Sequence, residues 1–162
     1  MSCNLYKPHL HIYSEDAATH DIAIGFKQHF PDCLRRQIQV FQCGTGYASI
    51  REEMKNDAGL GKYKFRRVLC VIDFDNSPGR GQEIKQLATP GSQGRVYVVG
   101  CAGEVETAKQ SVGFSGTNEN FGATLAGMGN KYWSNRNLAG SKCELERLLR
   151  DLKTDGICIQ RE

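Results

Sequence analysis

The strongest constraint on the fold is an apolar run that ends in two aspartates. Between Arg67 and Asp73 the sequence reads Val-Leu-Cys-Val-Ile, and a second aspartate follows at Asp75. A continuous apolar run rich in β-branched residues is typical of a strand buried on both faces of a parallel sheet. The stretch 76–81, rich in Gly, Pro, Asn and Ser, ends the run. We therefore predict a strand over 66–73 that carries carboxylates at its carboxyl end.

Strand-like and helix-like segments alternate along the chain, with about 30 residues per unit, as in βαβ folds. The pattern predicts an α/β, Rossmann-like fold with a mainly parallel four- or five-stranded sheet flanked by helices. Ile157-Cys158-Ile159 is the candidate for an additional strand. The predicted strands are 8–14, 36–43, 66–73 and 95–101. The predicted helices are 15–30, one that follows the turn 44–46 and runs to about 56, 82–88, 104–112 and 141–153.

The pattern changes after Gly113, where Gly and Asn become frequent. We expect an α/β domain over 1–112 and a helical and loop-rich extension over 113–162, packed on the same domain. Ser141 is the predicted N-cap of the last helix, with Glu144 at the capping-box position. The pair Tyr132-Trp133 could stack on nucleic-acid bases, but core packing is the more common role of such a pair.

Composition excludes several classes of protein. A chain of 162 residues can bury a real core, and its net charge of +3 is too weak to indicate nucleic-acid binding alone. No apolar run approaches the roughly 18 residues of a membrane span, and the amino terminus lacks the apolar core of a signal peptide. We therefore expect a cytoplasmic protein with no membrane partner. Seven cysteines without a C-x-x-C pair predict reduced, mostly buried thiols, and His9 and His11 are expected to be structural.

Acidic residues follow three of the predicted strands. Glu15 follows the first, Asp73 and Asp75 end the third, and Glu104 and Glu106 follow the fourth. In a parallel sheet these carboxyl ends share one edge, where α/β proteins bind their ligands. Carboxylate oxygens suit Mg²⁺ or Mn²⁺, and two such ions about 4 Å apart can hold both the attacking and the leaving oxygens of a phosphodiester.

This order of acidic motifs resembles the TOPRIM domain, over about residues 8–112. The segment 10–15 is similar to its glutamate motif, 72–76 to its aspartate motif, and 98–106 to the late acidic motif of the OLD-type nucleases. Asp16 stands where that family usually has glycine. The resemblance implies that these carboxylates bind Mg²⁺ or Mn²⁺ and that Glu15 serves in acid–base chemistry. It also implies a later lysine near the scissile phosphate, for which Lys142 and Lys109 are candidates.

The leading hypothesis is therefore a metal-dependent phosphodiesterase that acts on DNA or RNA, alone, as a homodimer or with a partner protein. A role in bacterial nucleic-acid processing or anti-phage defence would follow only from the family analogy. One alternative is a non-catalytic receiver-like or nucleotide-sensing module. Another is a phosphatase of the haloacid-dehalogenase type, since an Asp-x-Asp after an apolar strand resembles that family's nucleophile motif.

Simpler roles compete for several of these residues. Glu15 and Asp16 could occupy the first turn of a helix capped by Ser14, where the helix dipole alone stabilises acidic residues. Glu104 and Glu106 could mark only another helix start. Arg80 could hold a phosphate, although a solvated loop residue is the favoured interpretation. The basic run 62–67 could meet a nucleic-acid backbone, but a solvated strand entrance is preferred.

Overall fold

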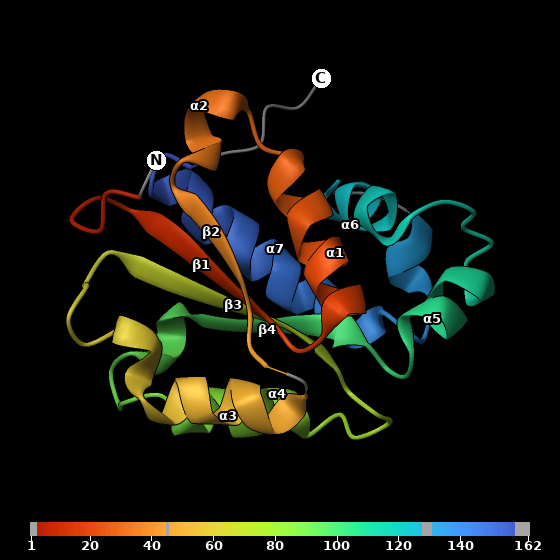
Figure 1. The fold of residues 1–162 in the computed structure, drawn as a ribbon, viewed down its shortest axis with the longest axis horizontal. Coiled ribbons are helices and arrows are strands. Elements are labelled where there is room, and N and C mark those ends of the chain that lie inside the picture. Colours follow the sequence, from red (N-terminus) through yellow and green to blue (C-terminus); the bar gives the residue numbers. More distant parts are fainter. Residues whose placement is uncertain (1–2, 45, 128–130, 158–162) are drawn as a thin grey trace.

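The fold is an α/β arrangement built on one parallel sheet. The computed structural model describes residues 3–44, 46–127 and 131–157, and these residues form a four-stranded sheet in the order β2-β1-β3-β4. Every neighbouring pair of strands is parallel. The predicted fold class is therefore confirmed, with four strands in the described part (Figure 1). The strands are β1 (His9–Ser14), β2 (Ile38–Gln42), β3 (Arg66–Asp73) and β4 (Val96–Cys101).

Helices cover both faces of the sheet. In Figure 1, α1, α6 and α7 lie above it, whereas α3 and α4 lie below it. These five helices are α1 (Ala17–Gln28), α3 (Tyr47–Lys55), α4 (Arg80–Leu87), α6 (Asn118–Ala126) and α7 (Ala139–Thr154). The shorter helices are α2 (Asp32–Arg35), α5 (Val105–Ser111), η1 (Asp57–Gly59), η2 (Gln93–Arg95) and η3 (Lys131–Ser134). None of the helices in the described part is long and apolar enough to span a membrane.

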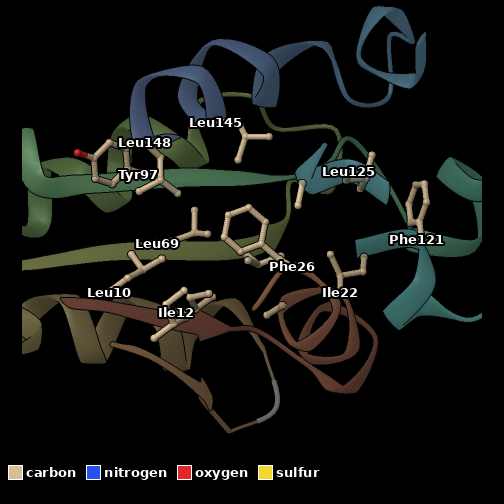
Figure 2. Packing of buried hydrophobic residues seen from close by; sticks show 14 of the residues in the cluster. Leu10, Ile12, Ile22, Phe26, Leu69, Tyr97, Phe121, Leu125, Leu145 and Leu148 are labelled. Atoms are coloured by element: carbon tan, nitrogen blue, oxygen red, sulfur yellow. The ribbon is translucent and has the colours of Figure 1, made fainter. Parts of the chain in front are cut away.

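The central strand β3 is buried on both faces, as its continuous apolar run predicts. Leu69 and Val71 pack into the core beneath α1, α6 and α7, whereas Val68, Cys70 and Ile72 pack against α3 and α4. Figure 2 shows the larger core, in which Leu and Phe side chains of α1, α6 and α7 meet those of β1 and β3. Trp133 lies in this core and Tyr132 packs against it, which supports the core interpretation of that pair.

Two glycines let α1 and α6 cross in close contact. A Cβ atom on Gly25 would lie 1.8 Å from the carbonyl oxygen of Glu119, and one on Gly122 would lie 2.0 Å from that of Ile22. Real Cβ atoms do not approach backbone that closely. The segment after residue 113 is thus joined to the first helix by direct backbone contact.

Side chains of α7 form hydrogen bonds with the backbone amides and carbonyls on the outer edge of β4. The Val98 amide donates to Glu144 (3.1 Å), and the Gly100 amide donates to Ser141 Oγ (2.8 Å), which in turn donates to the Gly100 carbonyl (2.8 Å). Arg147 donates to the carbonyl of Val96. The prediction that Ser141 caps the helix is wrong, because Ser141 lies within α7 and Leu138 occupies the N-cap without a side-chain bond. These polar side chains serve the sheet edge instead.

Arg66 and Arg67, the last two residues of the basic run 62–67, hold parts of the fold together through their side chains. Arg66 is 6% exposed and donates to His9 Nε2 (3.0 Å) and to the Ala58 carbonyl (2.7 Å). Arg67 forms a two-point ion pair with Asp155. The interpretation of this run as a solvated strand entrance is therefore wrong for both arginines.

Histidine and cysteine side chains near the sheet are largely internal. His9 and His11 are buried, and burial together with the Arg66 charge lowers the pKa of His11 to about 3. The structural interpretation of His9 and His11 agrees with this placement. Six cysteines lie in the described part and all are free: Cys3, Cys70 and Cys101 are buried, Cys43 is half-buried, and Cys33 and Cys143 are exposed. Ile157 is buried, but the rest of the possible strand at 157–159 lies outside the described residues.

Close packing of α1 on α6 predicts that Gly122→Ala lowers the free energy of unfolding by about 1–3 kcal/mol, the usual cost of overpacking. Because alanine forms helices better than glycine, a loss of stability in this variant must come from the clash of the new Cβ with the carbonyl of Ile22. Gly140→Ala is the matched control, because a Cβ there meets nothing within 4 Å in α7. Urea denaturation measures both variants, and equal stability of Gly122→Ala and the control would contradict the close crossing.

Candidate functional site

The candidate site lies where the chain reverses its direction across the sheet. From β1 the chain moves outward to the edge strand β2 and then returns to the other side of β1 as β3. The carboxyl ends of β1 and β3 are therefore neighbours at the topological switch point, where open α/β sheets bind ligands. Glu15 directly follows β1, and Asp73 is the last residue of β3.

A hydrogen bond joins these two strand ends. Glu15 Oε2 accepts from the Asp73 amide at 2.9 Å, and the Glu15 amide in turn lies 3.3 Å from the Val71 carbonyl. Glu15 is only 9% exposed. Burial is the largest influence on its carboxyl group and raises the pKa of Glu15, and the charges of Asp73 and Asp16 raise it further. The bond from the Asp73 amide and the charge of Arg80 act in the opposite direction.

Asp73 experiences a similar environment. Burial raises its pKa first, and the charges of Asp75 and Asp16 add to that effect. The Asp75 amide donates to Asp73 Oδ1 at 3.0 Å and, with Arg80, opposes the rise. Two neighbouring carboxyl groups with raised pKa values are a pair that a cation or a proton would stabilise.

The start of α1 separates the roles of Glu15 and Asp16. Asp16 is the N-cap and accepts from the Thr19 amide at 2.9 Å, while Thr19 Oγ1 accepts from the Asp16 amide at 3.0 Å. The prediction that Ser14 caps this helix and that Glu15 lies in its first turn is wrong. Ser14 belongs to β1, and Glu15 precedes the helix, so stabilisation within a helical turn does not account for Glu15.

Arg80 supplies positive charge beside the carboxylates. Its Nη1 donates to the Asp73 carbonyl at 2.9 Å, and its Nη2 lies 3.5 Å from Asp75 Oδ2. The guanidinium also lies over the ring of Tyr47, 4.3 Å from the centroid. The interpretation of Arg80 as a solvated loop residue is therefore wrong.

Asp75 occupies a strained turn at the edge of the cluster. Its φ is 48° and that of Asn76 is 55°, both in the left-handed region that non-glycine residues rarely adopt. Its side chain is 75% exposed and faces Arg80. The amides of this turn extend the hydrogen bonding between β3 and β4, since the Phe74 amide donates to the Cys101 carbonyl and the Asn76 amide donates to the Ala102 carbonyl. The turn thus fixes the peptide that follows Asp73.

The remaining predicted residues are not brought to Glu15 and Asp73 by any hydrogen bond or ion pair in the described part of the chain. Glu104 is the exposed N-cap of α5 and makes no capping bond with its side chain. Glu106 pairs with Lys109 at 3.1 Å, and Lys109 also donates to Asn118 at 3.0 Å. Lys142 is exposed on α7. No hydrogen bond or ion pair between described residues joins any of them to Glu15 or Asp73.

Within the described ranges, no group of three or more His, Cys, Asp or Glu side chains is arranged to hold a metal ion. Glu15 accepts a hydrogen bond from a backbone amide, and Asp75 faces Arg80. The arrangement nevertheless places the Glu15 carboxylate against the Asp73 backbone, with Asp75 two residues further along the chain. That set can bind a cation through two protein ligands and water, which is the usual mode for Mg²⁺.

Sequence reasoning considered Arg80 as a phosphate ligand but preferred a solvated loop residue, and it missed Tyr47 and the capping role of Asp16. Asp16 and Thr19 stand three apart, so a capping-box pattern could have located the helix start. No local signal marks Arg80 or Tyr47, since α3 and α4 bring them together across 33 residues.

Comparison of the chain with protein-family models, with curated proteins and with solved structures gives no match in any of the three. The geometry of Glu15, Asp73, Asp75 and Arg80 is therefore what indicates a function.

The raised pKa values predict an unusual pH dependence of stability. A carboxyl group whose pKa is higher in the folded state favours folding when protonated, so this contribution is lost as pH rises through the folded pKa. Asp73→Asn keeps an oxygen for the Asp75 amide but removes the charge. We expect it to raise the free energy of unfolding at pH 7, where wild type buries the charged form of Asp73.

The difference should shrink below the ordinary carboxyl pKa, where Asp73 is protonated in both states. Denaturation of wild type, Asp73→Asn and the exposed control Glu146→Gln at several pH values measures it. Destabilisation of Asp73→Asn at pH 7 would contradict the account of this pair.

Proposed function

We propose that this protein binds Mg²⁺ or Mn²⁺ through Glu15 and Asp73, with Asp75 close by, and hydrolyses phosphodiester bonds in DNA or RNA. One observation carries the proposal: at the switch point the Glu15 carboxylate accepts from the Asp73 backbone amide, the pKa of each carboxyl group is raised, and the Asp73 charge contributes to the raised pKa of Glu15. Such a pair is costly without a cation, and two carboxylates at the end of parallel strands are hard ligands suited to these ions.

The residues around the pair suit phosphate chemistry. A divalent cation bound there would polarise a phosphoryl oxygen. Arg80 presents a planar guanidinium beside the carboxylates and can hold a phosphate oxygen. A carboxylate of this cluster that does not ligate the cation could accept a proton from the attacking water. Asp16 is committed to the cap of α1 and takes no part.

The order of acidic residues also supports a TOPRIM-type assignment, in which Glu104 and Glu106 would contribute further carboxylates. Lys109 is already engaged by Glu106 and Asn118, so exposed Lys142 is the better candidate for the catalytic lysine. Under this proposal the protein binds a nucleic acid in the cytoplasm. A second copy of the chain or a partner protein could complete the active site.

A second candidate is a receiver-like or nucleotide-sensing regulatory module. The order β2-β1-β3-β4 favours it, because doubly wound domains with that order also bind ligands at the β1/β3 switch point. Such a module would bind a cation at the same carboxylates but would not cleave a polymer.

Calorimetric titration with Mg²⁺ and Mn²⁺, paired with plasmid and RNA cleavage assays, tests these functions. We expect wild type and Glu146→Gln to bind and cleave, and Asp73→Asn to lose at least about tenfold in affinity, equivalent to about 1.4 kcal/mol. Binding without cleavage would favour the regulatory module. Absence of binding by the wild type would contradict both functions.

Arg80→Gln should separate binding from turnover. Removing a positive charge beside Asp73 leaves cation affinity unchanged or higher, whereas loss of a phosphate contact should lower cleavage by about 10–100-fold, or about 1.4–2.8 kcal/mol. Arg80→Lys keeps the charge without the planar fork and should recover part of the rate. Steady-state cleavage beside calorimetry on the same samples checks this, and an unchanged cleavage rate would remove Arg80 from the site.

A further inference from the structure

The two edges of the sheet differ. On β4 the outer backbone groups are bonded to side chains of α7, as described above. On β2, the carbonyl of Gln37 and the amide of Cys43 bond to β1. Successive residues of a strand alternate, so the amides and carbonyls of Val40 and Gln42 point outward. Among the described residues, no hydrogen bond engages these outward amides and carbonyls. This edge of the sheet is therefore open for pairing with another strand.

A groove runs beside this open edge on the α3 side of the sheet. Its volume is about 600 Å³, and Phe41, Gln42 and Cys43 form one wall while the exposed flank of α3 forms the other. Phe41 is 37% exposed and stacks on Tyr13, with ring centroids 5.3 Å apart and an interplanar angle of 22°. The ring of His11 also meets Phe41, with centroids 5.0 Å apart and an interplanar angle of 61°, and the exposed part of the Phe41 ring lies at the side of the groove.

The α3 wall of the groove is acidic. Glu52 and Glu53 line it together with Ser49 and Asn56, and no basic residue is among the residues that line the groove. Glu52 forms a largely exposed ion pair with Lys55 at 3.2 Å. Glu53 is half-buried, and its negative charge contributes to the raised pKa of the Cys43 thiol. Because no hydrogen bond or ion pair to another described residue engages Glu53, it is the charge that a cationic ligand would meet.

We propose that β2 and this groove bind an extended segment of a partner protein that carries arginine at alternate positions. The segment adds a strand along Val40 and Gln42, and its side chains on the α3 side enter the groove. Backbone pairing supplies affinity, and the groove selects the side chain. This inference goes beyond the proposed nuclease function and does not depend on it.

Arginine fits the groove better than other side chains. In an added strand, the residue opposite Phe41 points to the same face of the sheet, with its Cβ about 5 Å away. A guanidinium there can stack on the ring of Phe41 and pair with the carboxylate of Glu53. A neutral side chain of the same shape keeps the backbone pairing but loses the charge-assisted hydrogen bond.

The test is an NMR titration of the full ¹⁵N-labelled chain with the acetylated, amidated peptide Thr-Arg-Thr-Arg-Thr. The matched probe replaces both arginines by citrulline, which is nearly isosteric and uncharged. We expect saturable shifts of the Val40, Gln42 and Glu53 amides with the arginine peptide, and at least about tenfold weaker binding of the citrulline peptide. Glu53→Gln should weaken binding of the arginine peptide by a similar factor.

The edge is tested with Gln42→Pro, which removes an outward amide without touching the ladder to β1, and with Gln42→Ala as its control. Loss of binding in Gln42→Pro alone supports strand addition. Unchanged binding in that variant, or shifts in the groove without shifts at the edge, would overturn it. If the citrulline peptide bound as tightly as the arginine peptide, the proposed preference for arginine would be wrong. If the arginine peptide caused no amide shifts at millimolar concentration, the proposed binding would be wrong. If Gln42→Pro does not fold, the amide shifts and Glu53→Gln decide.

Discussion

The hydrogen bond from the Asp73 amide to Glu15 is the contact on which the site depends, because it joins the carboxyl ends of two adjacent strands. It exists because β3 lies beside β1 in the sheet, a placement set by the burial of β3 on both faces. The apolar run of this strand therefore does more than fill a core. It fixes the end of the strand, and with it the Asp73 carboxyl group, whose charge raises the pKa of Glu15.

The surrounding structure stabilises an arrangement that is locally unfavourable. Burial and neighbouring charges raise the pKa values of Glu15 and Asp73, and Asp75 begins a turn with positive φ. Elsewhere the molecule packs closely, with α1 against α6 across Gly25 and Gly122, and with α7 bonded along the edge of β4. This contrast between a well-packed scaffold and a strained acidic edge is typical of functional sites.

Sequence reasoning predicted the fold class correctly and placed Glu15 and Asp73 at the ends of neighbouring strands, because both inferences depend on local patterns. The run 66–73 matches β3 at both ends, since an apolar run bounded by a basic pair and a Gly/Pro loop is distinctive. The errors concern residues whose partners are distant in the chain. Ser141 resembled a helix cap but bonds to β4, Arg66 resembled a solvated residue but lies under η1, and Arg80 reaches Asp73 only after α4 is placed. Pattern and propensity carry no information about such contacts.

The most direct test of the central claim is paramagnetic line broadening of backbone amides by substoichiometric Mn²⁺. If Glu15 and Asp73 form the cation site, the amides of residues 15–16 and 73–76 should broaden first, and excess Mg²⁺ should restore them. Broadening centred on the acidic groove of Glu52 and Glu53 instead, or spread evenly over exposed carboxylates, would contradict the account.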